Sequence, residues 1–147
     1  MTTSMTESQK KFGVKNATNT LDHVVGFYVE SEDMYFNATL FFRHLYSYRS
    51  VDVMCYTFNC GLLGNSFPID RVIANKLIGT IPDSLKYKLW KNIHSKMYIC
   101  KGRNYTHIWV GSQNFNTPTY KEIMFKVSRR NHAACKRYFD SCWHNLL

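Results

Sequence analysis

Residues 94–112 contain two runs typical of β-strands, joined by a turn that would fold them into a hairpin. The runs are HSKMYIC and THIWVGS, and the turn between them contains KGRN. Gly and Asn tolerate the backbone angles that a tight turn requires, whereas the β-branched and aromatic residues on either side favour strands. The segment therefore predicts a β-hairpin, so the fold is expected to contain a sheet.

The rest of the chain supplies further strands and three helices around this hairpin. Strands are predicted at 24–30, 51–58 and 121–128, and helices at about 38–49, 69–79 and 131–147. The element order is β-α-β-α-β-β-β-α, which predicts an α/β fold with a mixed sheet flanked by helices. The last helix should turn one apolar face inward, formed by Cys135, Tyr138, Phe139, Cys142 and Leu146.

Length and composition predict a single folded domain. The chain has 147 residues, of which 45% are hydrophobic and 16% aromatic, so it can bury a core and is not a disordered protein. Residues 1–20 are polar and lack periodicity, which indicates a tail or arm, and the domain is expected over 21–147. The first residues lack the apolar stretch of a signal peptide, and we expect a soluble, cytoplasmic protein without stable membrane association.

The positive charge is concentrated in the second half of the chain. Residues 1–85 hold seven Lys or Arg against eight Asp or Glu, whereas residues 86–147 hold twelve against two. No acidic residue lies between Asp83 and Glu122. A polyanion is the natural partner of such a half, although a basic surface that serves solubility is the alternative. The five cysteines are irregularly spaced and form no CxxC pair, so we expect reduced thiols, no metal site and no cofactor.

The spacing of polar residues in the hairpin predicts a site for a phosphate group. Residues two apart in a strand share one face, so His94 and Lys96 should lie side by side, as should Ser112 and Asn114 if the second strand persists that far. Antiparallel pairing could bring both pairs onto one surface. That surface would hold hydrogen-bond donors and a nucleophile or base, without a nearby anion to repel phosphate. Taken singly, each of these residues could equally belong to an exposed strand face or an ordinary turn.

The order HxK, then GSxNF, then Glu resembles the HKD motif of the phospholipase D superfamily, and in particular its small single-motif endonucleases. The resemblance in motif covers residues 94–122. It implies a metal-independent phosphodiesterase in which His94 is the nucleophile or the acid–base group. Lys96 and Asn114 would hold phosphate oxygens, Ser112 would support them, and Glu122 would orient the imidazole.

The chain departs from the family pattern at one position and contains one copy of the motif. Lys101 stands where the motif has Asp, and no other HxK occurs. Since the reaction requires two histidines, we expect a symmetric homodimer in which two copies of His94 meet. Lys101 and Arg103 are predicted to place a basic hairpin tip beside the cleft, where they would bind nucleic acid together with Lys91 and Lys121.

Three functions agree with these observations. A nuclease is favoured, with DNA as the preferred substrate and RNA as an alternative, because the basic half suits a polyanion. A non-catalytic nucleic-acid-binding protein is the second, and Lys101 at the motif Asp position favours it. A lipid phosphodiesterase is the third. A small nuclease of this kind could serve a bacterium or a phage, and the sequence does not choose between them.

Overall fold

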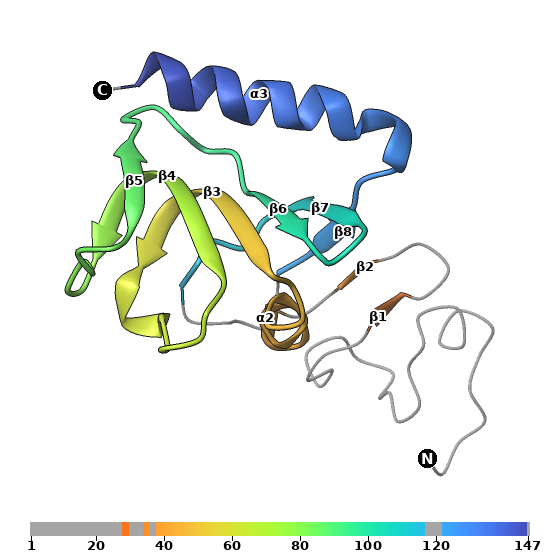
Figure 1. Cartoon of the computed structure of the whole chain (residues 1–147), viewed down its shortest axis with the longest axis horizontal. Coiled ribbons are helices and arrows are strands. Elements are labelled where there is room, and N and C mark those ends of the chain that lie inside the picture. Colours follow the sequence, from red (N-terminus) through yellow and green to blue (C-terminus); the bar gives the residue numbers. More distant parts are fainter. Residues whose placement is uncertain (1–27, 30–33, 36–37, 117–121, 147) are drawn as a thin grey trace, which may run out of the picture.

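The structure places a mixed β-sheet between two helices, α2 on one face and α3 on the other (Figure 1). This computed structural model describes residues 28–29, 34–35, 38–116 and 122–146. The predicted tail at 1–20 lies outside the described residues. The elements in chain order are β1 (Tyr28–Val29), β2 (Met34–Tyr35), α2 (Ala38–Leu45), β3 (Ser50–Asn59), the 3-10 helix η3 (Cys60–Leu62), β4 (Ile69–Ile78), β5 (Lys86–Leu89), β6 (Met97–Lys101), β7 (Thr106–Gly111), β8 (Met124–Lys126), the 3-10 helix η4 (Arg129–Asn131) and α3 (His132–Asn145).

The sheet has the strand order β1-β2-β8-β7-β6-β3-β4-β5 in the described part of the chain. The β3–β4 and β4–β5 pairs are parallel, and the other neighbours are antiparallel. The predicted hairpin is confirmed, since β6 pairs with β7 in a register that places Cys100 opposite His107. The expectation of a mixed α/β domain that ends in a helix is also confirmed.

Two hydrophobic clusters hold the helices against the sheet. The α2-side cluster includes Phe41 and Leu45 of α2, and the α3-side cluster includes Phe139 of α3. Neighbouring strand residues point to opposite faces, so Val53 packs with the α2-side cluster and Met54 with the α3-side cluster. In β4, Val72 and Ala74 likewise face α2, while Ile73 faces α3. A sheet buried on both faces presents continuous apolar runs in its central strands instead of a strict alternation with polar residues.

This double burial explains the one wrong assignment of element type. Residues 69–79 were expected to form a helix because their apolar residues recur at helical spacing, but Ile69–Ile78 is strand β4. Consecutive Val72, Ile73 and Ala74 are all fully buried, as expected for a strand covered by a helix on each side. Residues 60–68 carry the chain back to the start of β3, with Leu62, Leu63 and Phe67 packed on the α2-side cluster.

Several element boundaries also differ from expectation. The first helix ends at Leu45, and the short edge strand β5 was not foreseen. In α3, Phe139 is buried as expected, but Tyr138 is exposed, and Trp143 packs on the sheet with Cys135, Cys142 and Leu146. Of the strand predicted over 24–30, the structure describes only β1.

Candidate functional site

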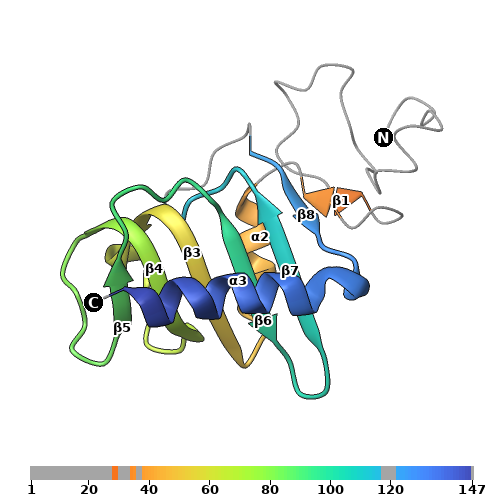
Figure 2. The same cartoon turned by 90° about the horizontal axis from the view of Figure 1, so that it is seen from above.

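Three chain segments that carry polar residues meet at one end of the central strands. They are the second half of β3, residues 92–96 before β6, and residues 112–116 after β7. They meet because β6 runs antiparallel to both β3 and β7, so the start of β6 lies beside the middle of β3 and the end of β7. Figure 2 shows this end of β6 and β7 opposite to the turn that joins them. We call the place where residues 92–96, residues 112–116 and the second half of β3 meet the motif end of the sheet.

His94 and Lys96 lie in the connection that leads into β6, and not in the strand itself as predicted. The strand begins at Met97, and buried Ile93 anchors the connection in the α3-side cluster. His94 is exposed, and its ring stacks on Tyr56 of β3 with centroids 5.2 Å apart and planes inclined by 23°. The site histidine is therefore accessible to a ligand while one face of its ring rests on an aromatic side chain.

Ser112 and Glu122 form a second contact at this end. Strand β7 ends at Gly111, so Ser112 and Asn114 lie beyond it, although the alternation continues because Gln113 and Phe115 are buried. The Ser112 hydroxyl donates a hydrogen bond to the Glu122 carboxylate and accepts one from the Ile123 amide at 2.9 Å. The hydroxyl thereby fixes the backbone that carries Glu122.

Gly111 is required because two backbones approach closely at this point. A Cβ atom on Gly111 would lie 1.9 Å from the Ile123 carbonyl oxygen and 2.7 Å from the Met124 sulfur. The Gly111 amide also donates to the Lys96 carbonyl at 3.3 Å, and so links the GSxN segment to the HxK segment. The glycine of GSxN thus permits the strand contact that brings Glu122 to Ser112.

Asn114 joins the GSxN segment to β3. Its Oδ1 accepts hydrogen bonds from the amides of Tyr56 at 2.9 Å and Thr57 at 3.2 Å. Because both partners are donors, the oxygen must face them, and the Nδ2 group is left to donate to an anionic oxygen. A hydrogen bond therefore links Asn114 to Tyr56, the residue on which the His94 ring stacks.

Sequence reasoning missed two residues at the motif end, Tyr56 and Lys76. The Lys76 ammonium of β4 lies 6.0 Å from the centre of the Tyr56 ring. Lys76 could not be placed from the sequence because β4 was taken for a helix. The signal for Tyr56 was only its position in the predicted strand 51–58, which does not indicate a histidine as its neighbour.

Cys55 lies beneath this end of the sheet and is unsuited to chemistry. Burial raises the pKa of its thiol to about 12, although the Phe115 backbone and the Lys96 charge lower it in part. A thiol reacts as its thiolate, so Cys55 is a packing residue at neutral pH. The influence of Lys96 indicates that this ammonium lies close to the motif end.

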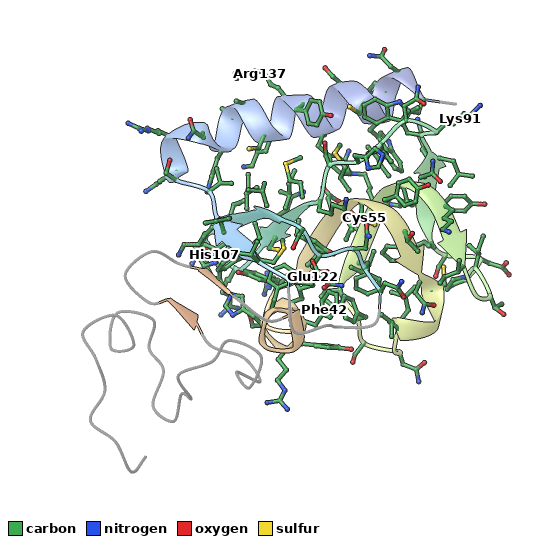
Figure 3. The ribbon with its side chains drawn as sticks, turned by 180° about the vertical axis from the view of Figure 1, so that it is seen from behind. Phe42, Cys55, Lys91, His107, Glu122 and Arg137 are labelled. Carbon is green, nitrogen blue, oxygen red and sulfur yellow. The ribbon has the colours of Figure 1, made fainter. Side chains whose placement is uncertain are left out.

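The predicted nucleic-acid-binding residues lie in separate places. Lys91 is exposed just before the HxK segment and points away from the sheet (Figure 3). Lys101 ends β6 and Arg103 lies in the turn to β7, at the other end of the strands, so the prediction that this tip lies beside the cleft was wrong. Lys121 lies outside the described residues.

Lys101, at the motif Asp position, forms an ion pair with a carboxylate on another strand. Its ammonium lies 3.7 Å from the carboxylate of Asp52, which is buried in β3. Asp52 also pairs with Arg71 of β4 at 2.7 Å. Lys101 therefore takes part in an ion pair within the sheet.

The described residues hold no group of three or more His, Cys, Asp or Glu side chains that could bind a metal. Among the cysteines, Cys55 and Cys60 lie on the α2 face, whereas Cys135 and Cys142 lie on the α3 face. The sheet separates the two pairs, so these four thiols cannot bind one ion. Within the same part of the chain, no helix has the length and apolar character needed to cross a membrane.

No protein-family model matches the chain, and a search of curated proteins finds no match. What the motif end can do therefore follows from its own geometry and charge. It combines an accessible imidazole, an ammonium, an amide donor and a hydroxyl bonded to a carboxylate.

Proposed function

We propose that the protein is a metal-independent phosphodiesterase with a phospholipase D-like fold that cleaves nucleic acid, with DNA as its favoured substrate. The observation that carries this proposal is the meeting of the HxK, GSxN and Glu segments at one end of the sheet. The sequence singled out these residues by their spacing, and a phosphate bound beside His94 is proposed to contact the rest of the set.

Each side chain has a defined part in this proposal. A His94 ring nitrogen attacks phosphorus, and the phosphorus–oxygen bond to the leaving group breaks while a second histidine protonates the departing oxygen. Water then attacks the phosphohistidine, gives its proton to that second histidine, and restores free His94. The Lys96 ammonium and the Asn114 Nδ2 group stabilise the charge on the non-bridging oxygens. Glu122, held by Ser112, is proposed to orient His94.

The second histidine is proposed to be His94 of another copy of the chain. Two copies related by a two-fold axis would bring the exposed His94 side chains together, provided that the motif ends face each other. Sedimentation velocity combined with an activity assay tests this arrangement, because an active monomer contradicts it.

Charge favours nucleic acid over lipid as the substrate. Residues 86–147 carry twelve Lys or Arg against two Asp or Glu, and exposed Lys91 and Lys76 flank the motif end. A phosphodiester chain matches a basic surface of this extent, since each neutralised phosphate adds to affinity.

Cleavage in EDTA by matched histidine variants tests the proposal. Labelled single-stranded DNA, double-stranded DNA and RNA are incubated with the wild type, His94→Ala and His144→Ala, which alters an exposed histidine in α3. We expect the wild type and His144→Ala to cut and to trap acid-labile phosphate, and His94→Ala to do neither. Cleavage by His94→Ala, or a requirement for a divalent metal, would refute the mechanism.

A non-catalytic nucleic-acid-binding protein is the second candidate. Lys101 favours it, because the nuclease motif has Asp at this position and the chain has none there. Lys101, however, pairs with Asp52 within the sheet, which favours an intact fold. Tight binding of oligonucleotides by wild type and His94→Ala, with no cleavage by either, would establish this second function.

A further inference from the structure

A basic groove lies between the β6–β7 turn and the start of α3, far from His94. It encloses about 1130 Å³ and is lined from three elements: the turn, the end of β8 with the following residues, and α3. Its cationic side chains are Lys101, Arg103, Lys126, Arg129 and Lys136, and no Asp or Glu is among the described residues that line it. Positive charge therefore converges here from segments distant in the sequence, as a polyanion requires.

Three of these cations are available to a ligand. Lys101 and Lys126 have interactions within the protein, Lys101 with Asp52. Arg103, Arg129 and Lys136 are exposed, and none forms an ion pair within the described residues. An exposed cation without an acidic partner binds a phosphate without first breaking an internal contact.

Tyr105 adds an aromatic surface to the groove. Its ring lies against Gly102 so closely that a Cβ atom there would come within 2.1 Å of the ring, and it is 4.8 Å from the His107 ring. The side chain is nonetheless 47% exposed. An exposed tyrosine held in place beside a basic groove is the combination with which proteins stack the bases of single-stranded nucleic acid while binding its backbone.

We propose that the basic groove binds a single-stranded segment of nucleic acid, with phosphates on Arg103, Arg129 and Lys136 and a base on Tyr105. The inference rests on the nucleic-acid substrate of the proposed function and assigns a second contact outside the motif end. Lys96 and Lys101 are separated by the length of β6, about 16 Å at 3.3 Å per residue. A stacked strand covers that distance with about five nucleotides.

Neighbouring residues offer a matched test. Arg129 and Lys136 line the groove, whereas the adjacent Arg130 and Arg137 do not, and Arg137 points away from the sheet (Figure 3). The double variants R129A/K136A and R130A/R137A each remove two exposed charges and introduce the best helix-forming residue. They therefore change net charge equally and differ in whether the groove is altered.

Binding is measured by fluorescence anisotropy in EDTA with a labelled 20-nucleotide single strand, each variant carrying His94→Ala so that nothing is cut. We expect R129A/K136A to raise Kd about tenfold and to reduce the slope of log K against log salt by about 1.4, the value for two lost phosphate contacts on a single strand. R130A/R137A should bind as the parent does. The proposal is overturned if the two double variants weaken single-strand binding equally, or if neither of them weakens it.

Tyr105→Leu tests the single-stranded character of the ligand. We expect this variant to weaken single-strand binding about tenfold without changing the salt slope, and to leave blunt duplex binding unaltered. Equal loss for single strand and duplex overturns the assignment of a single-stranded ligand. Cleavage is measured in a separate assay with the wild type, in which His94 is intact. Groove-dependent binding without cleavage thus contradicts only the catalytic proposal, and cleavage with a groove that has no effect on binding contradicts only this one.

Discussion

Arg71 donates a hydrogen bond of 2.7 Å to Asp52, a carboxylate that is 1% exposed, and a second bond of 3.1 Å to Asp140 of α3. Its guanidinium also lies over the Phe139 ring, 4.7 Å from the ring centre. One side chain thus ties β4 to β3 and to the helix that covers them. Arg71→Met should lower the free energy of unfolding by about 2 kcal/mol, because it leaves Asp52 buried with only the longer Lys101 contact.

Lys86→Met is the control for this prediction. Lys86 lies opposite Arg71 in the β4–β5 register, but its pair with Asp70 is exposed on both sides. Pairs of that kind contribute less than about 1 kcal/mol. Urea unfolding measures the free energy of unfolding of both variants. If Lys86→Met lost as much stability as Arg71→Met, burial of Asp52 would not be the cause.

His44 should make stability depend on pH. Burial lowers the pKa of His44 below its ordinary value of 6.5, and the charges of His107 and Lys126 lower it further. The unfolded chain then binds a proton more readily than the folded protein does. The contribution of His44 is complete above pH 6.5 and is lost progressively as the pH falls from there through the lower folded pKa.

Urea unfolding at about pH 7.5 and about pH 5.5 measures this effect, since histidine titrates between these values. We expect the wild type to lose stability at the lower pH and His44→Gln to lose less, because Gln carries no titrating group and can still bond to the Tyr48 hydroxyl. His144→Gln, at the exposed end of α3, should behave as the wild type does. An unchanged pH dependence in His44→Gln would contradict the assignment.

The sequence predicted the elements whose signal is local. Thr106–Gly111, Ser50–Asn59 and the last helix were found within one or two residues at most of their ends, because turn residues and apolar periodicity mark them directly. Strand β4 was missed because double burial produces an apolar run without period-two alternation. Strand β5 is short and largely exposed, so it has almost no apolar signal.

The site was predictable in its residues but not in its surroundings. Spacing singled out His94 and Asn114, yet only the register of three strands shows that Tyr56 lies between them. In the same way, the sequence placed Lys101 beside the motif, whereas the length of β6 places it at the opposite end. Local patterns identify which side chains carry chemistry, and tertiary pairing decides which of them meet.

Gly111→Ala should destabilise the protein and disturb the Ser112–Glu122 contact. The new Cβ would lie 1.9 Å from the Ile123 carbonyl oxygen, which belongs to backbone and cannot move without shifting the Glu122 segment. Overpacking of this kind costs about 1–3 kcal/mol. Gly64→Ala is the control, because no atom lies within 4 Å of its added Cβ. Urea unfolding and the cleavage assay should both separate these variants, and equal behaviour would mean that the strands adjust freely.

Two substitutions of Asn114 separate its structural role from its proposed catalytic one. Asn114→Asp keeps an oxygen for the Tyr56 and Thr57 amides but replaces the Nδ2 donor with negative charge, so stability should be retained while cleavage falls at least about 100-fold. Asn114→Ala leaves both amides without that acceptor and should also lower the free energy of unfolding by about 1–3 kcal/mol. Urea unfolding and cleavage kinetics in EDTA measure the two effects. If Asn114→Asp cut as fast as the wild type, Nδ2 could not be the group that stabilises the phosphate, and Asn114 would serve only to hold the GSxN segment against β3.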